Sequence, residues 1–463
     1  MKQLVPMAKF FAILLLITSL NACGPETETV DINSGLVKNF NSDVPIAWNN
    51  MFLEVDRYAK GYRPTPAPRA LGYLGLAAYE GCISGMPEYQ SQVSRYPGLN
   101  VPKTQSGKEY HWPTVINAIY ADMMPRFFPT AAPDLLEKMT ALEKTLDYQQ
   151  AQDISDDVML RSKEYGKSVA DAFWAWETTD VVGHDAYKDP FGTYDWQSHW
   201  NNEDGKYKMT SPGPAQPTFS YWGDVRPFAI DKSERLCKAP IPFSKDPKSA
   251  FYAQAIETFN NCNPAQAYEL RWIAEFWSDD LVDLTFSPAS RWIAIASQVI
   301  EGQDASLDKA LECYAKTGMA LADAVVGCWY SKYYYNVERP ITFINREIDA
   351  NWTTTLVDPY THTSNITPPF PAYPSGHSTM GGAAAETIAS VFGNDITLSD
   401  KCHLNRTEFI GRPRTFNSLS DMATENSTSR IWLGVHFRMD SETGVDFGRS
   451  IGRKVNKLSW KKK

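Results

Sequence analysis

Two cations in the C-terminal half of the chain could share one anion. Lys332 and Arg339 stand seven positions apart, and Pro340 follows directly. Seven residues make two turns of an α-helix, so the spacing predicts that both side chains lie on one helix face. Pro340 has no backbone N–H and is expected to end or kink that helix. Two cations on a helix face are usually solvated, so this segment indicates chemistry only together with others.

A second segment reads Pro-Ser-Gly-His at 374–377 and precedes a run of small and apolar residues. This pattern predicts the start of a helix, where backbone N–H groups and the helix dipole favour an anion. Ser375 adds a hydroxyl donor, and Gly376 lets an anion approach the backbone closely. His377 can add or withdraw a proton. The alternative interpretation is a capped helix with an exposed histidine.

A third segment joins a cation to a histidine and a carboxylate. Arg430 is followed by His436 and, four residues later, by Asp440. Residues four apart are neighbours on a helix, so we expect the carboxylate to contact the imidazole. Such a contact fixes the tautomer and leaves the other ring nitrogen as a nucleophile or a metal ligand. A single pair of this kind is most often structural.

Taken together, the three segments supply the groups that one tetrahedral oxyanion needs. Two guanidinium forks, an ammonium, a hydroxyl and backbone N–H groups all donate to such oxygens, and arginine does so bidentately. No Gly-rich phosphate loop of the nucleotide-binding kind is present. The combination therefore predicts a site for phosphate or a phosphate-like anion.

Eleven residues of these segments, taken in order over 332–440, match a family signature. On them the sequence resembles the type 2 phosphatidic acid phosphatase and vanadium haloperoxidase superfamily. The resemblance implies that the oxygens of phosphate or vanadate are bound by Lys332, Arg339, Arg430, Ser375 and the N–H of Gly376.

The resemblance also implies the catalytic roles. His436 would be the nucleophile on phosphorus or the axial ligand of vanadium, His377 the acid or base, and Asp440 the residue that orients His436. Family members support the arginine with a further carboxylate. Asp279 and Asp280 are the two candidates for it in this chain.

Residues around the motif favour a haloperoxidase over a phosphatase. Phe370 and Trp329 match positions near the halide in haloperoxidases. The lipid phosphatases of the superfamily cross the membrane six times, and no apolar run outside the N-terminus is long enough to do so. The soluble acid phosphatases are much shorter. The favoured function is a vanadium-dependent haloperoxidase, and the alternative is an acid phosphatase with a phosphohistidine intermediate.

The two functions imply different partners. A haloperoxidase would hold vanadate as cofactor, which acts as a Lewis acid on hydrogen peroxide so that a halide is oxidised to hypohalous acid. A phosphatase would take a phosphate ester. A third interpretation is a non-catalytic, glycan-binding helical lipoprotein, which the 14 Trp and 23 Tyr would suit. The net charge of −9 argues against nucleic acid as a partner, and a homo-oligomer is left open.

The elements that must position these residues are predicted to be helices, and the fold class to be all-α; the resemblance implies a large helical bundle of the vanadium haloperoxidase type. Apolar residues recur at helical spacing over 70–81, 114–128, 134–146, 154–176, 247–259, 265–277, 289–300, 306–334, 376–392 and 428–457. An irregular stretch over 178–245, rich in Gly, Pro and Trp, is either a functional loop region or a surface insertion. We expect one mainly helical domain over 23–463, with its catalytic core at about 265–457.

The N-terminus predicts export. Lys2 and Lys9 precede an apolar run over 10–20, and Ala22 stands directly before Cys23. This pattern predicts a signal peptide over 1–22. The residues before Cys23 resemble a bacterial lipobox, so Cys23 is expected to be lipidated. The protein would then be exported and anchored by lipid to the outer membrane, periplasmic or surface-exposed, with no other contact to the membrane. The alternative is an ordinary secreted protein.

Overall fold

The structure of the protein is a computed structural model that describes residues 35–152, 154–191, 203–208, 216–263, 265 and 267–462. The chain from Gly35 onward forms one compact unit. The predicted signal peptide over 1–22 and the predicted lipidation residue Cys23 lie outside the described residues and stay predictions.

Helices make up most of this unit, and the all-α prediction is confirmed. The N-terminal half contains α1 (Asp43–Tyr58), α2 (Pro66–Cys82), α3 (Trp112–Phe127), α4 (Pro133–Gln150) and α5 (Asp156–Glu177). The C-terminal half contains α6 (Ala250–Asn261), α7 (Tyr268–Phe276), α8 (Pro288–Gly302), α9 (Leu307–Tyr335), α10 (Pro340–Glu347), α11 (Gly376–Phe392), α12 (Leu419–Trp432) and α13 (Arg438–Asn456). Strands β1 (Leu398–Asp400) and β2 (Arg414–Phe416) pair antiparallel, with Leu398 opposite Phe416.

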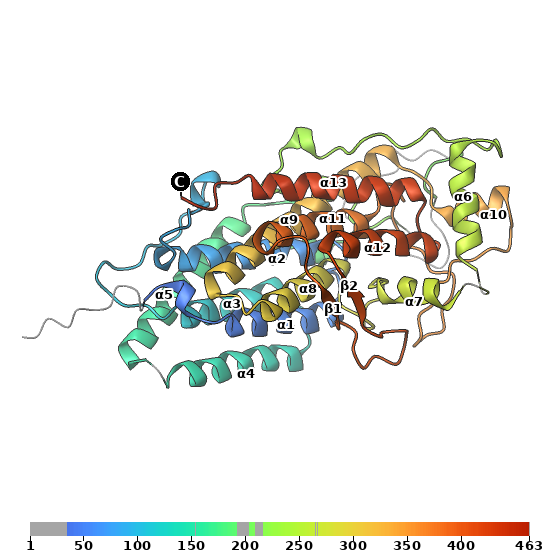
Figure 1. Cartoon of the computed structure of the whole chain (residues 1–463). Coiled ribbons are helices and arrows are strands. Elements are labelled where there is room, and N and C mark those ends of the chain that lie inside the picture. Colours follow the sequence, from blue (N-terminus) through green and yellow to red (C-terminus); the bar gives the residue numbers. More distant parts are fainter. Residues whose placement is uncertain are drawn as a thin grey trace, which may run out of the picture. The chain divides into compact units, whose positions relative to one another are not determined.

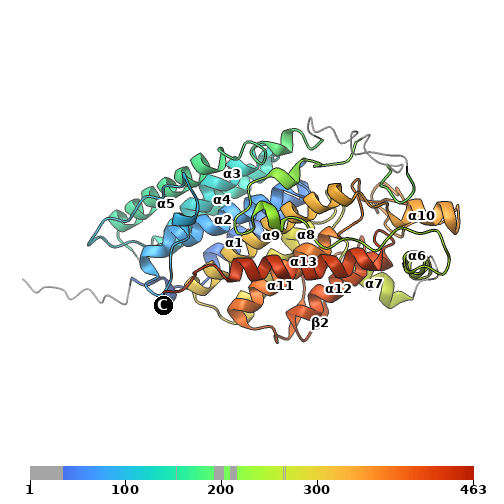
Figure 2. The ribbon, with the colours of Figure 1, turned by 90° about the horizontal axis from the view of Figure 1, so that it is seen from above.

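Helix α9 lies at the centre of the bundle. It packs against α2 on one side and against α11 and α13 on the other, as Figures 1 and 2 show. Most of its residues from Leu307 to Lys332 are buried. A helix that is buried all round is stable only with neighbours on every side, which these helices provide. Its last turn carries Lys332 to the end of the bundle where α6, α7 and α10 lie.

Helices α11 and α13 approach each other so closely that glycine is required between them. A Cβ atom on Gly448 would lie 2.0 Å from the carbonyl oxygen of Thr379, and one on Gly382 would lie 2.4 Å from that of Val445. Gly382, one of the small residues that follow His377 in the sequence, therefore permits this close packing. This contact fixes the start of α11 against the start of α13, and both starts carry candidate site residues.

Two expected helix arrangements are wrong. The segment 428–457 is two helices, because Gly434 adopts a φ of +86° and the chain turns between α12 and α13. Lys332 and Arg339 do not share a helix face. Helix α9 ends at Tyr335, Asn336 takes a left-handed φ of 52°, and Arg339 is the N-cap residue of α10, with Pro340 in its first turn. In both places a residue with a left-handed backbone conformation ends the first helix. The end of that helix and the start of the next therefore lie close together.

The irregular stretch over 178–245 contains no α-helix among its described residues, and part of it holds the corner between α9 and α10 in place. The amide of Tyr207 donates to the carbonyl of Asn336 at 2.9 Å, and the amide of Glu338 donates to that of Gly205 at 3.0 Å. This stretch therefore supports the segment between Lys332 and Arg339, as a functional loop region would.

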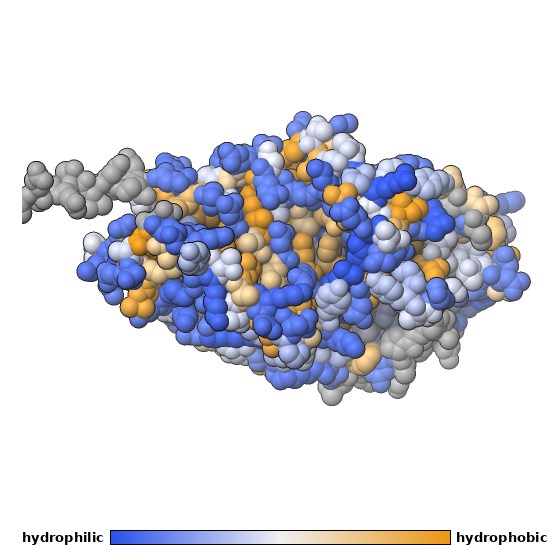
Figure 3. Space-filling view, turned by 90° about the horizontal axis from the view of Figure 1, so that it is seen from below, coloured by the Kyte–Doolittle hydropathy of each residue, from blue (hydrophilic) through white to orange (hydrophobic). Residues whose placement is uncertain are grey.

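In the described part of the chain, no helix has both the length and the apolarity that crossing a membrane requires. On the face drawn in Figure 3, hydrophilic residues cover most of the surface, and hydrophobic ones gather only in small groups between them. Small scattered groups of this kind are ordinary on a folded surface.

Candidate active site

The three cations of the sequence motif come from three helix ends and are all buried. Lys332 and Arg339 flank the α9–α10 corner, and Arg430 lies in the last turn of α12. The Lys332 ammonium donates to the carbonyls of Pro371 and Ala372 at 2.8 and 3.0 Å. Burial, followed by the charge of Arg339 among the lowering causes, reduces the pKa of Lys332 to about 7. A buried cation whose pKa is reduced in this way is stabilised by an anion.

Arg339 connects two loops to His436. Its Nε donates to the carbonyl of Phe370 at 2.8 Å, and its Nη1 donates to that of Val435 at 2.8 Å. The same Nη1 lies 3.1 Å from Nε2 of His436. Its remaining nitrogen, Nη2, is buried and has no hydrogen-bond partner among the described residues. Arg339 therefore keeps a free donor beside the histidine.

Arg430 is held by the loop after α7. Its Nη2 donates to both oxygens of Asp280, at 3.0 and 2.8 Å, and its Nη1 donates to the carbonyl of Ser278 at 3.3 Å. Its Nε is buried and unpartnered among the described residues. Of the two candidate carboxylates, the structure thus brings Asp280 to the arginine.

Asp279 belongs to a neighbouring network instead. Its carboxylate accepts from Nε2 of His403 at 2.9 Å and from Nη1 of Arg291 at 3.3 Å, and Arg291 also pairs with Asp400 at 2.9 Å. Although burial opposes the shift, Arg291 and His403 hold the pKa of Asp279 below its usual value. Asp279 has a φ of +43°, so the chain turns sharply between the two carboxylates and sends them to different partners.

His436 and Asp440 are in contact, but not on one helix face. His436 lies in the turn before α13, and Asp440 lies in the first turn of that helix. The Asp440 carboxylate accepts from Nδ1 of His436 at 3.0 Å and from the amide of Phe437 at 3.0 Å. A proton on Nδ1 leaves a lone pair on Nε2, which faces Arg339. Burial, then the charges of Arg339, Lys332 and Arg430, holds the pKa of His436 well below its usual value, so the ring is neutral.

The start of α11 closes the site. Ser375 is its N-cap residue, with its hydroxyl accepting from the amide of Ser378 at 3.4 Å, and Gly376 and His377 form the first turn. Nε2 of His377 donates to the carbonyl of Ser278 at 2.7 Å, which leaves Nδ1 able to accept a proton. Burial, then the charge of Arg430, lowers the pKa of His377 to about 4. Sequence reasoning missed Ser278, whose contacts to His377 and Arg430 are made by its backbone carbonyl and leave no trace in residue type, and whose hydroxyl donates to Asp280 at 3.2 Å.

The site carries more positive than negative charge. Three cations, Lys332, Arg339 and Arg430, face two carboxylates, Asp280 and Asp440. Burial raises the pKa of Asp440 to about 7 and lowers that of Arg339 to about 10. Two guanidinium nitrogens in this cluster are unpartnered among the described residues. A bound oxyanion would supply acceptors and negative charge, so the residues fit phosphate or vanadate.

An aromatic wall lies beside the cations. The rings of Trp329 and Phe370 are 4.9 Å apart, and the Lys332 ammonium lies 5.2 Å from the Phe370 ring. Both aromatic residues line a cavity of about 200 Å³ together with Gly376, His377, Arg430 and His436. The cavity therefore places the candidate halide residues beside the candidate anion site. The cavity also contains Arg63, which no motif indicated because it lies in the N-terminal half of the chain.

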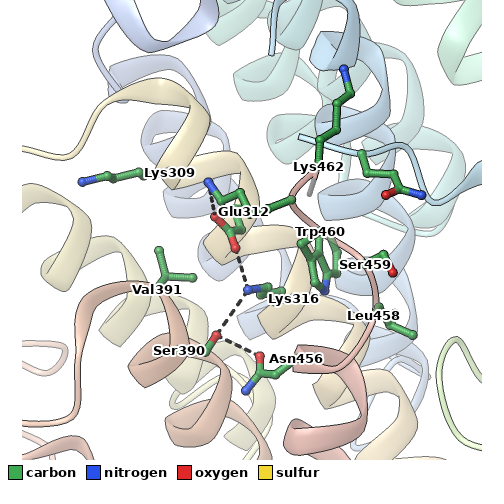
Figure 4. A pocket seen from close by; sticks show the side chains of 12 residues that line it. Lys309, Glu312, Lys316, Ser390, Val391, Asn456, Leu458, Ser459, Trp460 and Lys462 are labelled. Atoms are coloured by element: carbon green, nitrogen blue, oxygen red, sulfur yellow. Dashed lines mark hydrogen bonds and ion pairs between the residues drawn. The ribbon is translucent and has the colours of Figure 1, made fainter. Parts of the chain in front are cut away.

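A larger hollow of about 760 Å³ lies elsewhere on the unit, between the N-terminal part of α9 and the chain after α13 (Figure 4). Its buried ammonium, Lys316, pairs with Glu312 at 2.5 Å, and Lys461 pairs with the same carboxylate at 3.3 Å. Lys332 stands 20 residues beyond Glu312 on α9, or about 30 Å along the axis. The larger hollow has four lysines and one carboxylate but no histidine among its lining residues, so the smaller cavity is the better candidate for chemistry.

Known proteins resemble the chain in both sequence and fold. A family model for the VCPO second helical-bundle domain matches residues 312–461. The vanadium chloroperoxidase of Curvularia inaequalis is 23% identical over 88% of this chain and 81% of its own length. The vanadium-dependent bromoperoxidase of Ascophyllum nodosum is 31% identical over 18% of this chain and 17% of its own length.

Solved structures extend the similarity to nearly the whole chain. A bacterial vanadium-dependent iodoperoxidase superposes with a TM-score of 0.78 at 27% identity, covering 92% of this chain and 98% of its own. The holo form of a bacterial vanadium-dependent chloroperoxidase gives a TM-score of 0.64 at 14% identity, covering 86% and 92%, and shows the same fold. The helical bundle of the vanadium haloperoxidase type is confirmed, and over residues 312–461 the chain matches the second helical-bundle domain of that family.

Proposed function

We propose that the protein is a vanadium-dependent haloperoxidase that oxidises a halide with hydrogen peroxide. The observation that carries the proposal is the Nε2 atom of His436, which presents its lone pair inside a cluster of three buried cations with unpartnered donors. The similarity over most of the chain to a bacterial iodoperoxidase and to the chloroperoxidase of Curvularia inaequalis supports this chemistry over others of the same pocket.

The cofactor is held by residues whose positions suit the task. Lys332, Arg339 and Arg430 would bind the vanadate oxygens, with Ser375 and the amide of Gly376 adding hydrogen bonds at the start of α11. His436 would ligate the metal through Nε2. Vanadate, when bound, supplies a Lewis-acidic centre at which hydrogen peroxide becomes reactive toward a halide.

The protein controls charge and protons around that centre. Asp440 keeps the proton of His436 on Nδ1 and so keeps Nε2 available. His377 is neutral at pH 7, since burial lowers its pKa to about 4, and its Nδ1 can take a proton from a bound peroxide. Trp329 and Phe370 give the halide an apolar surface that excludes water from the reacting atoms.

The direct test is an assay of purified protein with orthovanadate, hydrogen peroxide and chloride, bromide or iodide in turn. We expect halide oxidation that depends on vanadate and is inhibited by phosphate, which competes for the same cations. A phosphomonoester assay on protein free of vanadate runs alongside. Phosphate release with no halide oxidation would replace the proposal with the phosphatase of the same pocket, and inactivity in both assays would leave the non-catalytic interpretation.

We further propose export and lipid anchoring at the outer membrane. The proposal rests on Lys2, Lys9, the apolar run over 10–20 and the Ala22–Cys23 pair. Labelled fatty acid should enter the wild-type protein in a bacterial host and should not enter Cys23→Ala. Equal labelling of both proteins would disprove lipidation at this residue.

A further inference from the structure

Arg63 brings a fourth guanidinium to the cavity of the candidate active site. It lies in the loop between α1 and α2, more than 200 residues before the motif, and lines the same cavity as Trp329, Phe370 and His377. Its side chain is 7% exposed. The guanidinium is therefore buried, and Arg63 belongs to the lining of the cavity that also contains the aromatic wall.

The hydrogen bonds of Arg63 are incomplete. Its Nη2 donates to the carbonyl of Thr285, whereas Nε and Nη1 have no hydrogen-bond partner among the described residues. The nearest carboxylate oxygen is Oδ1 of Asp56, 4.0 Å from Nε. A buried cation with two unused donors is costly unless an anion or a polar group completes its shell.

Asp56 forms a long ion pair with Arg63 through Oδ1, which has no hydrogen-bond partner among the described residues, and the other acidic groups nearby are committed to other partners or exposed. Oδ2 of Asp56 accepts from the amide of Ser287 and the hydroxyl of Ser290, at 2.6 and 2.7 Å, and so caps α8. Asp280 binds Arg430, and Asp279 binds Arg291 and His403. The carboxylate of Asp283 is on an exposed residue outside the cavity lining. Among the described residues, none of these carboxylates accepts a hydrogen bond from Arg63.

We propose that Arg63 is the halide-binding residue of the cavity, a role that rests on the proposed haloperoxidase function. A halide is a small monovalent anion that one guanidinium can hold through the two N–H groups left unused. Trp329, Leu356, Ile366 and Phe370 give the cavity that Arg63 lines an apolar part of its wall, which suits a weakly hydrated, polarisable anion more than a phosphate ester. The vanadate-binding cations would remain free for the oxyanion, so two different anions would use two separate groups of donors.

The test measures halide affinity separately from turnover. In vanadate-loaded protein at saturating hydrogen peroxide, Arg63→Gln should raise the KM for the halide by roughly tenfold or more, because charge-assisted hydrogen bonds are lost, while kcat changes little. Arg63→Lys should restore part of the affinity. Vanadate binding should be unchanged in both variants, since the described residues show no hydrogen bond or ion pair between Arg63 and the oxyanion cluster.

Arg57→Gln is the matched control. It removes the same charge from the neighbouring end of α1, where Arg57 donates to the carbonyl of Asp283 and does not line the cavity. Its halide KM should equal that of the wild type. An equal rise in Arg57→Gln, or no rise in Arg63→Gln, would overturn the role.

A second readout does not depend on activity. Crystals of wild-type protein without vanadate, soaked in bromide, should show an anomalous peak within hydrogen-bonding distance of Arg63, and Arg63→Lys crystals should show a weaker one. A bromide peak only elsewhere in the cavity would refute the inference even if Arg63→Gln fails to fold. A wild type that oxidises no halide would instead disprove the proposed function, and the position of bromide would still decide whether Arg63 binds the anion.

Discussion

At the scale of single residues, the site depends on a shortage of negative charge. Asp280 engages Arg430 with both oxygens, and Asp440 holds His436, which leaves three cations with two carboxylates. The lowered pKa values of Lys332 and Arg339, both caused first by burial, show how poorly the folded protein tolerates these charges alone. Binding an oxyanion would relieve this cost, so the fold favours the proposed cofactor before it binds.

Arg430 should therefore contribute strongly to anion binding. Arg430→Gln removes the positive charge and the unpartnered Nε donor. Vanadate or phosphate should therefore bind about 2–4 kcal/mol more weakly by titration calorimetry. Arg414→Gln is the control, because Arg414 makes a similar two-oxygen pair with Glu425 of the same helix outside the cavity. Unchanged affinity in a folded Arg430→Gln protein would remove this residue from the anion site.

At the scale of elements, the sequence predicts well whatever depends on local pattern. Helical periodicity located α2 to α9 and α11, and Ser375 was expected to begin a helix, as it does. The order of the motif residues was also sufficient to nominate the cluster. These features depend on neighbours within a few residues, which sequence spacing reports directly.

The errors at this scale come from turns and from long-range contacts. The breaks at Asn336 and Gly434 depend on left-handed residues inside apolar patterns, and only tertiary packing decides that the chain turns there. A Cβ atom on Gly434 would lie 2.5 Å from Sγ of Cys262, a contact with a residue far away in the sequence. The choice between Asp279 and Asp280, and the presence of Arg63, likewise depend on which distant segments meet.

At the scale of the whole molecule, the two halves of the chain have different tasks. The C-terminal helices α9 to α13 carry the anion-binding residues, while the loop after α1 reaches the same cavity with Arg63. The network of Asp279, Arg291 and Asp400 joins α8 and β1 to the loop after α7, and all three side chains are almost fully buried. This network therefore supports the loop that holds Arg430.

Buried carboxylates of this network should make the protein sensitive to acid. Although burial opposes the shift, Arg291 holds the pKa of Asp279 and of Asp400 below the usual value. A carboxyl group with a lowered folded pKa stabilises the protein above its unfolded pKa of about 3.9, and this contribution is lost as the pH falls through the folded pKa. The melting temperature should therefore fall as the pH is lowered below about 4.

Asp400→Asn isolates this contribution. It breaks a buried ion pair and should cost about 3–5 kcal/mol at pH 7, while making the melting temperature depend less on pH below 4. Asp157→Asn, which breaks an exposed pair with Arg161, should change stability far less. An Asp400→Asn protein as stable as the wild type at pH 7 would show that the network does not support the fold.

The central claim is that His436 holds the cofactor in the cation cluster, and the variant His436→Ala tests it most directly. Vanadate-dependent halide oxidation should disappear in the folded variant, because the lone pair that faces Arg339 is lost. Asp440→Asn should keep part of the activity, since the ligand nitrogen remains, and His362→Asn, a change of an exposed histidine with a φ of 56°, should keep all of it. A folded His436→Ala protein with the full wild-type rate would contradict the account.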